Sequence, residues 1–416
     1  MKFFDPNDYS GTDTEKIQSA VADAHREGSF VRMGRRRADE RSSRDFWLID
    51  SAILLPENMT FILCNTKIKL SDASRDNFFR SANCPLHSDG TVPDEISNIH
   101  LIGEGKAVLE GADHPRSSGD SNKTLGVQKI KPYPPDGPDG SHRMTYGTDA
   151  GKEGEVQKGD WRNIGVLFVK ATDFSIENLT ILRPHCWGIS LGYCRKGTVR
   201  DIEFETREYR MVDGVQERML NQDGLDLRRG CSNILIENIY GNSGDDLIAL
   251  TSIGSKVRPS GQFGYTEYLG GTEDVREQDV HHITIRNVRG CSYGGYFIIR
   301  FLNQRGVHMH HIFVDGVFEN APEGRYGSAA IKIGAPNYAG SAALGETWGF
   351  HIHNVCTQAR RGIYFGAPLS DSVISDLLYF RYKEEHCVTS HHGEKEYELP
   401  NVVFHNIQVM DMFEKK

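Results

Sequence analysis

Short apolar segments recur in pairs along most of the chain, a longer segment being followed by a shorter one. Apolar and polar residues alternate within them, which is typical of strands rather than helices. This recurrence predicts an all-β fold, a single-domain parallel β-helix over residues 1–416 with its coils at about 52–410. The longer segments are 96–102, 174–181, 198–204, 234–239, 283–288, 311–317, 350–355, 373–380 and 402–409, and the shorter ones are 189–191, 225–227, 247–250, 297–299, 331–333 and 363–365.

A leucine-rich repeat is the alternative solenoid, but it requires a Leu-rich consensus of fixed length, and the spacing of the segments varies here. Four asparagines fall at the same phase of their segments. We therefore expect them to stack as a ladder in a turn between coils. They are Asn178, Asn238, Asn287 and Asn354.

Residues 1–50 predict a cap for one end of the solenoid. Thr12 and Glu15 form a capping box, and Gly28 stands where a helix C-cap belongs. We expect a capping helix over 12–28, because an uncovered solenoid end exposes an unpaired strand edge. The apolar face of this helix consists of Ile17, Val21 and Ala24.

A single carboxylate precedes a carboxylate pair by about one repeat. Asp223 lies 22 and 23 residues before Asp245 and Asp246. If one coil takes this many residues, the three lie on adjacent coils, whose strands are roughly 4.8 Å apart. Carboxylates offset along such strands reach the roughly 6.5–9.5 Å spacing of inverting glycosidases, and their repulsion raises at least one pKa. The simpler alternative is that these Asp and Asn residues only make turns.

The motifs resemble those of glycoside hydrolase family 28, in which Asn-Thr-Asp-Gly is followed by Gly-Asp-Asp on the next coil. The resemblance implies a right-handed parallel β-helix that acts on carbohydrate without a cofactor. It implies that Asp245 is the general acid, and that Asp223 and Asp246 position and deprotonate water. The matching residues are Asn221, Asp223, Gly224, Asp226, Gly244, Asp245 and Asp246.

The chain departs from the family pattern on the two following coils. Gly294 and Gly295 have no His between them, and Ala330-Ile331-Lys332 keeps the family's Lys but not its Arg. Tyr293 and Tyr296 are candidates for the position of the missing His, and Arg300 is a candidate for the missing cation. The expected substrate-binding residues are thus Asn221, Lys332, Arg300 and Tyr296.

Three insertions, at about 111–162, 252–279 and 383–400, are predicted loops that wall a substrate cleft. A long loop beside the acids would favour an exo-acting enzyme, and the alternative is a surface excursion. Trp187 and His185 lie where the family carries a cleft aromatic, with core packing as the other interpretation. His308, His310 and His311 alternate on a strand and are either a metal site or a solvated edge.

Composition excludes several other classes. The net charge of −9 argues against a nucleic-acid partner, and no apolar run suits a membrane helix. The eight cysteines show no paired CxxC spacing, so we expect reduced thiols and no metal. The charge-dense run 32–45 predicts a solvated loop. The N-terminus has no apolar signal core, which predicts a cytoplasmic protein, or a secreted one if a leader has been removed.

Three functions remain open. The first is an inverting glycoside hydrolase that cleaves α-glycosidic bonds, most simply in galacturonic-acid-containing saccharides of the pectin type. The second is a β-helix exo-glycosidase of other specificity, similar to an α-galactosidase, which the missing His and Arg favour. A lyase or epimerase would need a basic proton abstractor or calcium instead. The third is a non-catalytic carbohydrate-binding solenoid. The oligomeric state, the sugar and the linkage stay open.

Overall fold

The structure is a computed structural model. It describes residues 2–74, 76–84, 92–115, 142–144, 160–219, 221–253, 268–269, 272, 274–322, 326–335, 342–381 and 386–412. No helix within these ranges is long and apolar enough to cross a membrane.

Most of the described chain forms two parallel sheets. The larger has 13 strands among the described residues, and it follows the sequence order from one end of the molecule to the other. Its strands are β1 (Phe3–Phe4), β2 (Phe30–Met33), β3 (Trp47–Ile49), β5 (Met59–Leu70), β7 (Ile96–Glu110), β10 (Ala171–Leu182), β12 (Arg195–Glu205), β16 (Ser232–Ser243), β18 (Val280–Ser292), β20 (Met309–Glu319), β22 (Thr347–Thr357), β24 (Ser372–Arg381) and β28 (Val402–Asp411).

The smaller sheet has ten strands within the same described ranges. They are β4 (Ile53–Leu55), β6 (Phe79–Ser81), β9 (Val166–Val169), β11 (Ile189–Gly192), β15 (Leu225–Leu227), β17 (Ile248–Ser252), β19 (Phe297–Asn303), β21 (Ala329–Ile333), β23 (Ile363–Phe365) and β25 (Val388–Thr389).

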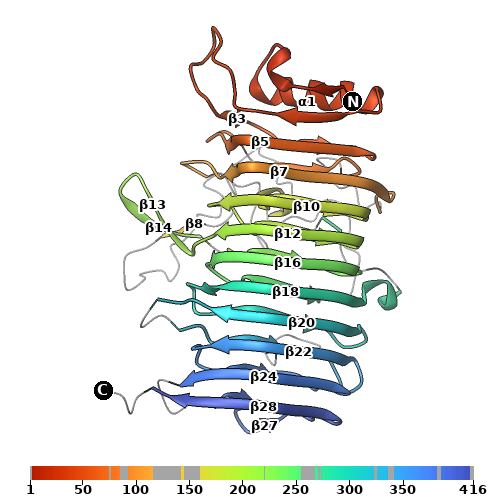
Figure 1. The fold of residues 1–416 in the computed structure, drawn as a ribbon, viewed down its shortest axis with the longest axis vertical. Helices are drawn as coiled ribbons and strands as arrows, with labels where there is room; N and C mark the ends of the chain where they lie inside the picture. Colours follow the sequence, from red (N-terminus) through yellow and green to blue (C-terminus); the bar gives the residue numbers. More distant parts are fainter. Residues whose placement is uncertain are drawn as a thin grey trace, which may run out of the picture.

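From β3 onward, strands of the larger sheet alternate along the chain with strands of the smaller one, so each of these coils contributes one strand to each sheet. Figure 1 shows the long strands stacked one above another, with the N-terminus at one end of the stack and the C-terminus at the other. The molecule is therefore a right-handed parallel β-helix, as predicted. Every predicted long segment lies inside an observed long strand, and the predicted short segments overlap the observed short strands.

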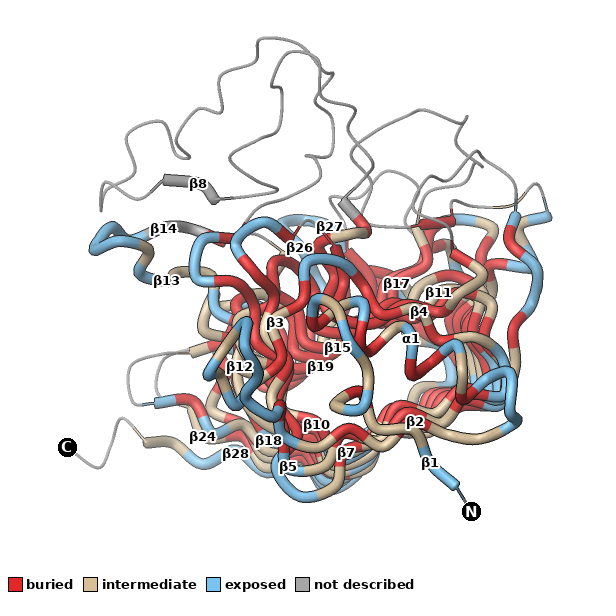
Figure 2. The backbone as a smooth tube through the Cα atoms, turned by 90° about the horizontal axis from the view of Figure 1, so that it is seen from above, coloured by how far each residue is buried: buried red, intermediate tan, exposed pale blue. Residues whose placement is uncertain are grey.

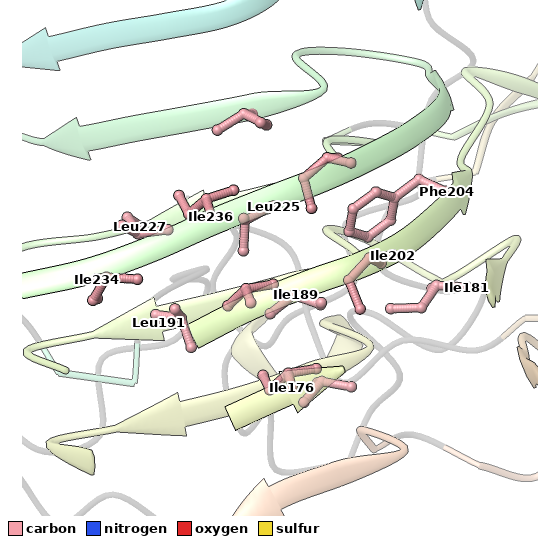
Figure 3. Close-up of a cluster of buried hydrophobic side chains, with 14 of the residues drawn as sticks. Ile176, Ile181, Ile189, Leu191, Ile202, Phe204, Leu225, Leu227, Ile234 and Ile236 are labelled. Atoms are coloured by element: carbon pink, nitrogen blue, oxygen red, sulfur yellow. The ribbon is translucent and has the colours of Figure 1, made fainter. Parts of the chain in front are cut away.

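Aliphatic side chains fill the space between the two sheets. Ile236 of β16 pairs in register with Val199 and Ile285 on the neighbouring coils, and all three are fully buried. On the smaller sheet Leu225 pairs with Ile189 and Ile248 in the same way. Figure 3 shows side chains of the two sheets meeting in this core, and Figure 2 shows burial concentrated inside the coils. Full burial of each such side chain contributes about 1.5–3 kcal/mol.

The long strands bend at residues with left-handed backbone angles. Asn238 and Asn287 have φ near 56° and 50°, and Asn287 Nδ2 donates to Asn238 Oδ1 at 2.7 Å. The predicted ladder is present, but Asp takes the place of Asn on some coils. Asn238 donates to Asp201, and Asn406 donates to Asp376, because either side chain tolerates this conformation and can accept from the coil above.

Helix α1 (Asp13–Arg26) covers the N-terminal end of the stack, as predicted. Thr12 and Glu15 form the expected capping box, and the predicted apolar face is buried. The prediction that residues 32–45 form a solvated loop is partly wrong. Arg36 is 5% exposed, and its Nε lies 2.7 Å from Asp13 Oδ1, so this segment is tied to the cap by a buried ion pair. Strands β1, β2 and β3 also place the beginning of the large sheet within residues 1–50.

Two features differ from the sequence interpretation. A hairpin of β13 (Tyr209–Val212) and β14 (Val215–Met219) projects from the stack, and β14 pairs with β8 (His142–Met144). The segment 383–400, predicted as a loop, contains β25 and a small hairpin of β26 (His391–His392) and β27 (Lys395–Glu396). The remaining helical turns are η1 (Pro6–Asp8), η2 (Asp160–Asn163) and η3 (Val275–Gln278). The other two predicted insertions lie largely outside the described residues.

All eight cysteines are free thiols, and six of them are buried, which agrees with the expected reduced state. Trp187 and His185 are 6% and 4% exposed. Trp187 belongs to a cluster of buried apolar side chains that includes Trp161 and Tyr268, and His185 Nε2 accepts from the amide of Ala112 at 3.1 Å. The packing interpretation of this pair is thus the one that the structure supports.

Candidate active site

The three predicted acids lie in the turns that lead into β15 and β17. The parallel ladder continues into these turns, because the amide of Gly224 donates to Asp246 O at 3.0 Å and the amide of Leu225 donates to Leu247 O at 3.0 Å. The Asp246 amide also donates to Asp223 Oδ1 at 3.2 Å. One coil of spacing therefore brings Asp223 and Asp246 side by side, as the sequence predicted.

Glycines allow the turns to approach one another closely. A Cβ at Gly244, just before the acid pair, would lie 2.3 Å from the amide nitrogen of Glu208. A Cβ at Gly294, on the next coil, would lie 1.9 Å from Gly244 O. Only glycine fits at these contacts, so the Gly of the Gly-Asp-Asp motif serves packing. It also brings the acids beside the segment that leads into the β13–β14 hairpin.

The carboxylates form one cluster. One oxygen from each of Asp223, Asp245 and Asp246 can be chosen so that all three lie within 4.8 Å of one another. These closest oxygens are nearer than the expected carboxyl spacing of roughly 6.5–9.5 Å. Asp223 and Asp246 are 6% and 1% exposed, and Asp245 is half-buried. The prediction that no carboxylate lies more than about 10 Å from the other two is confirmed.

Burial raises the pKa of each of these carboxyls. The pKa of Asp223 and that of Asp245 both lie well above the usual range, since desolvation disfavours the charged form and the neighbouring carboxylates add to it. The pKa of Asp246 is also raised by burial, but the charge of Arg300 and a hydrogen bond from it oppose the rise. Asp246 is thus the member that the surroundings favour in its ionised form.

Arg300 of β19 provides the cation of the cluster. Its Nη1 lies 3.4 Å from Asp246 Oδ2, and the amide of Phe297 donates to Asp246 Oδ1 at 3.2 Å. Both oxygens of Asp246 are therefore held by donors from the following coil. Arg300 is 54 residues away in sequence, and the sequence identified it only as a candidate replacement for a missing cation.

Strand register extends the site across five coils. Asp226, Ala249, Arg300, Lys332 and Tyr364 are successive partners on the smaller sheet. Side chains at one register position share one face of a parallel sheet, here the outer face. Lys332 accordingly lies on the same face as the acids, as predicted.

The Lys332 ammonium lies among aromatic rings. Its Nζ is 4.7 Å from the ring centre of Phe297 and 5.4 Å from that of Tyr364. Burial, with the charges of Arg300 and Arg361, lowers the pKa of Lys332 to about 8, and Asp246 opposes this effect. Arg361 also lies 5.1 Å from the centre of the Tyr364 ring. The positive charges on this outer face therefore lie against nearly buried aromatic rings.

Asp226 is a fourth acid that we had matched to the family motif without assigning it a role. It is 1% exposed, burial raises its pKa well above the usual range, and Asp245 and Asp246 raise it further. Its Oδ2 has no hydrogen-bond partner among the described residues, and Oδ1 lies 3.8 Å from Arg228. Its place in the sequence could have revealed it. Asp226 is the middle residue of the strand Leu225–Leu227, and this middle residue faces outward, on the same side as the site.

The remaining predicted residues surround the cluster less closely. Asn221 is half-buried with φ of 51°, at the bend before Asp223. Tyr296 precedes β19 and is 37% exposed, and its amide donates to the Ser292 hydroxyl at 3.0 Å. That hydroxyl in turn donates to Asp245 O at 2.6 Å. The ring of Tyr293 lies 5.2 Å from the guanidinium of Arg207.

The β13–β14 hairpin is a feature of the site region that the sequence interpretation missed. It follows Glu208, whose charge raises the pKa of Asp245, and the chain returns from it to Asn221. Asp213 and Gly214, with φ of 50° and 80°, form its tip. Asp-Gly between two alternating segments is the usual signal of a two-residue hairpin turn, and it is present in the sequence.

Two groups of described side chains have the spacing to hold a metal ion. One is the acid cluster, and the other is His282, His310 and His311. The predicted set of His308, His310 and His311 is therefore only partly right. The His308 amide donates to Asp279 Oδ1 at 2.7 Å and its ring contacts Arg276, so His308 belongs to a different group, and His282 takes its place.

Comparisons with known proteins agree with the fold. No protein-family model matches the sequence, and no match was found among curated proteins. Among solved structures, an endo-xylogalacturonan hydrolase from Aspergillus tubingensis is similar with a TM-score of 0.50 and 11% identity, over 99% of this chain and 93% of that one. A tailspike protein mutant of E. coli bacteriophage HK620, in complex with a hexasaccharide, is similar with a TM-score of 0.52 and 12% identity.

The match to the tailspike covers 97% of this chain and 62% of the tailspike chain. The chain thus has the fold of a right-handed parallel β-helix, like these solved structures. Its outer face bears a cluster of buried acids beside an arginine and a lysine.

Proposed function

We propose that this protein is a glycoside hydrolase that cleaves α-glycosidic bonds with inversion. The observation that carries the proposal is the acid cluster, in which three carboxylates from adjacent coils lie within 4.8 Å with raised pKa values. Structural turns do not require buried, mutually repelling carboxylates, because an exposed Asp or Asn makes the same turn without the desolvation cost.

The environments of the acids assign the roles. Asp245 is the general acid, because burial and its carboxylate neighbours keep its proton in place. Asp246, in which Arg300 opposes the rise in pKa, deprotonates the attacking water, and Asp223 helps to hold that water. Both oxygens of Asp246 already accept a hydrogen bond, from the Phe297 amide and from Arg300. This stabilises the carboxylate and suits it to orienting water better than to attacking the sugar itself.

The outer face next to the acids favours an anionic sugar. Arg300 and Lys332 stand in register on neighbouring strands, and Arg361 lies near them beside Tyr364. A carboxylate on the substrate would form charge-assisted hydrogen bonds with these cations. We infer a galacturonic-acid-containing oligo- or polysaccharide as the substrate, with Asn221 and Tyr296 as further binding residues.

The experiment is a reducing-sugar assay with the full chain on galacturonan, rhamnogalacturonan and neutral α-galactosides. Release of reducing ends from an acidic polymer, which the Asp245→Asn variant fails to produce, is the expected result. Activity on neutral α-galactosides alone would support the exo-glycosidase alternative. A product with a new double bond, detected by near-ultraviolet absorption, would identify a lyase and contradict hydrolysis.

A second candidate is carbohydrate binding without hydrolysis. The similarity to a tailspike β-helix in complex with a hexasaccharide is the observation that favours it. In that case the wild-type chain would bind the same acidic oligosaccharide as the Asp245→Asn variant in calorimetry, and neither would release reducing ends after prolonged incubation.

A further inference from the structure

Four histidines gather away from the acids, at the other end of the same short strands. The acids precede β17 and Tyr296 precedes β19, whereas His281, His282, His310 and His311 follow these strands, at the beginning of β18 and β20. We call these four side chains the imidazole cluster. The acids and the imidazole cluster are thus separated by the length of a strand.

The imidazoles form two stacked columns across the two coils. The rings of His281 and His310 are 5.0 Å apart and nearly parallel, with an interplanar angle of 4°. Those of His282 and His311 are 4.7 Å apart at the same angle. Trp348, on the next coil, stacks on His310 with its ring centre 4.4 Å away. The column is therefore supported on one side, which limits the orientations that His310 can adopt.

The nitrogens of the two columns point toward each other. His281 Nδ1 and His282 Nδ1 are 2.7 Å apart, and His310 Nδ1 and His311 Nδ1 are 2.6 Å apart. In addition, one ring nitrogen from each of His282, His310 and His311 lies within 4.8 Å of the others. Three imidazole nitrogens supplied by two coils thus surround one point, and two of these rings are exposed while His310 is half-buried.

The fold does not by itself require histidine here. His282 and His311 have φ of 55° and 53°, at a position where every long strand from β10 onward has a left-handed residue. The coil before His282 has Asn233 at this position, and the coil after His311 has Gly349. Asn and Gly adopt this conformation more easily than His. The backbone therefore does not explain why both coils carry a pair of adjacent histidines.

We propose that the imidazole cluster binds a divalent transition-metal ion of the Zn²⁺ class through His282, His310 and His311. Zinc–nitrogen bonds of about 2.0–2.1 Å in a tetrahedral site place ligand nitrogens roughly 3.3 Å apart. Nitrogens already within 4.8 Å reach this spacing through side-chain rotations, which the exposed rings permit. Imidazole ligands select Zn²⁺, Ni²⁺ and Cu²⁺ over Ca²⁺ and Mg²⁺.

The surroundings of the cluster are compatible with a cation. The rings of His282 and His311 are exposed, so an ion can reach their nitrogens from solvent. Asp279 is the nearby carboxylate, and its charge acts on His281. A bound ion would link β18 to β20 at their N-terminal ends, so binding should stabilise the folded chain.

The test is calorimetric titration of the full chain with Zn²⁺ alone, together with thermal unfolding with and without Zn²⁺. We expect one equivalent to bind and the Tm to rise. His282→Asn and His311→Gly copy the residues of neighbouring coils and should keep the fold, yet each removes a direct ligand and should weaken binding by at least the roughly 10–100-fold that loss of an outer partner of a metal ligand costs. The absorption spectrum of the Co²⁺ form should show that nitrogen ligands are present and are lost in these variants.

Two controls separate this site from other groups. His308→Asn leaves the cluster intact, and Asp245→Asn removes one member of the acid cluster, so both should bind Zn²⁺ as the wild-type chain does. Unchanged Zn²⁺ affinity in His282→Asn and His311→Gly would overturn the proposal and leave the histidines as a stacking column. Loss of Zn²⁺ binding in Asp245→Asn would place the ion at the acids and equally contradict it.

Discussion

The acid cluster and the imidazole cluster are built in the same way from stacked coils, yet their surroundings differ. Asp223 and Asp246 are almost fully buried, and Arg300 on the next coil offsets part of their charge. His282 and His311 are exposed, and their contacts are mainly with other imidazoles. Burial raises the pKa of the acids and lowers that of His310, so in both clusters it favours the neutral form.

Under the two proposals, one repeat serves two kinds of chemistry. The unequal surroundings of Asp245 and Asp246 favour a proton donor and a base, which is what hydrolysis requires. Imidazoles at an accessible turn would offer ring nitrogens to a metal ion instead. The following experiments test this division of roles, beginning with the largest expected effect.

Substitution of the general acid should have the largest effect. Asp245→Asn keeps the shape of the side chain but removes the proton for the leaving oxygen, so we expect kcat to fall by about 10²–10⁴-fold with KM little changed. Steady-state kinetics on the best acidic substrate measures this, and His311→Gly is the matched control from the other cluster. An Asp245→Asn enzyme of normal activity would make the acid cluster structural.

The stereochemistry of the same reaction follows from the water-mediated mechanism. NMR of the first-formed product should show the inverted anomer. The closest carboxylate oxygens lie within 4.8 Å, nearer than the usual inverting spacing, so this measurement is a stringent one. Retention of configuration would mean that a carboxylate attacks the sugar directly and would contradict the role given to Asp246.

Loss of the arginine should change the pH profile. Arg300 lowers the pKa of Asp246, so Arg300→Gln should raise it, and the acidic limb of kcat/KM should move to higher pH because the base must be ionised. A displacement by one pH unit lowers kcat/KM about tenfold on the acidic side. Arg300→Lys retains the charge and should move the limb less. An unchanged limb in Arg300→Gln would show that Asp246 is not the titrating base.

Ionisation of Asp226, the fourth acid, should lower the free energy of unfolding. The folded pKa of Asp226 is raised above its unfolded value, so its contribution is fully present below the unfolded pKa and is lost as pH rises through the folded pKa. Asp226→Asn should therefore raise the Tm at pH 7 to 8, by about 1 °C for each kcal/mol regained, because the entropy of unfolding grows with chain length. The difference should vanish below about pH 4. The exposed Asp201→Asn serves as the control, and a lower Tm in Asp226→Asn at every pH would contradict the expectation.

Metal removal should have the smallest effect on turnover. Hydrolysis by the acid cluster uses water and protons alone, so EDTA should leave kcat unchanged while it abolishes any Zn²⁺-dependent rise in Tm. Assays before and after dialysis against EDTA, with Ca²⁺ or Zn²⁺ restored, measure both quantities. Activity that is lost with EDTA and restored by Ca²⁺ would assign an ion to the acids and reverse the division of roles between the two clusters.

Local patterns in the sequence were sufficient for the framework. Alternation located the strands, the Thr12 and Glu15 capping box located helix α1, and the separation of Asp223 from the acid pair predicted their meeting. Each of these depends on residues within one element or one short coil, where the chain itself fixes the geometry. The Asn ladder was predicted for the same reason, since a left-handed bend recurs at one phase of each strand.

The tertiary structure decided which distant side chains meet. Arg300 reaches Asp246, and His310 reaches His282, because coils joined by insertions of different length come into register through their strands. The burial of Asp226 and of Arg36 also followed from packing against segments far away in sequence. Sequence alone thus specified a β-helix and its three acids through short-range backbone preferences. The charges, pKa values and partners of those acids came from stacking, because they depend on which coils lie next to each other.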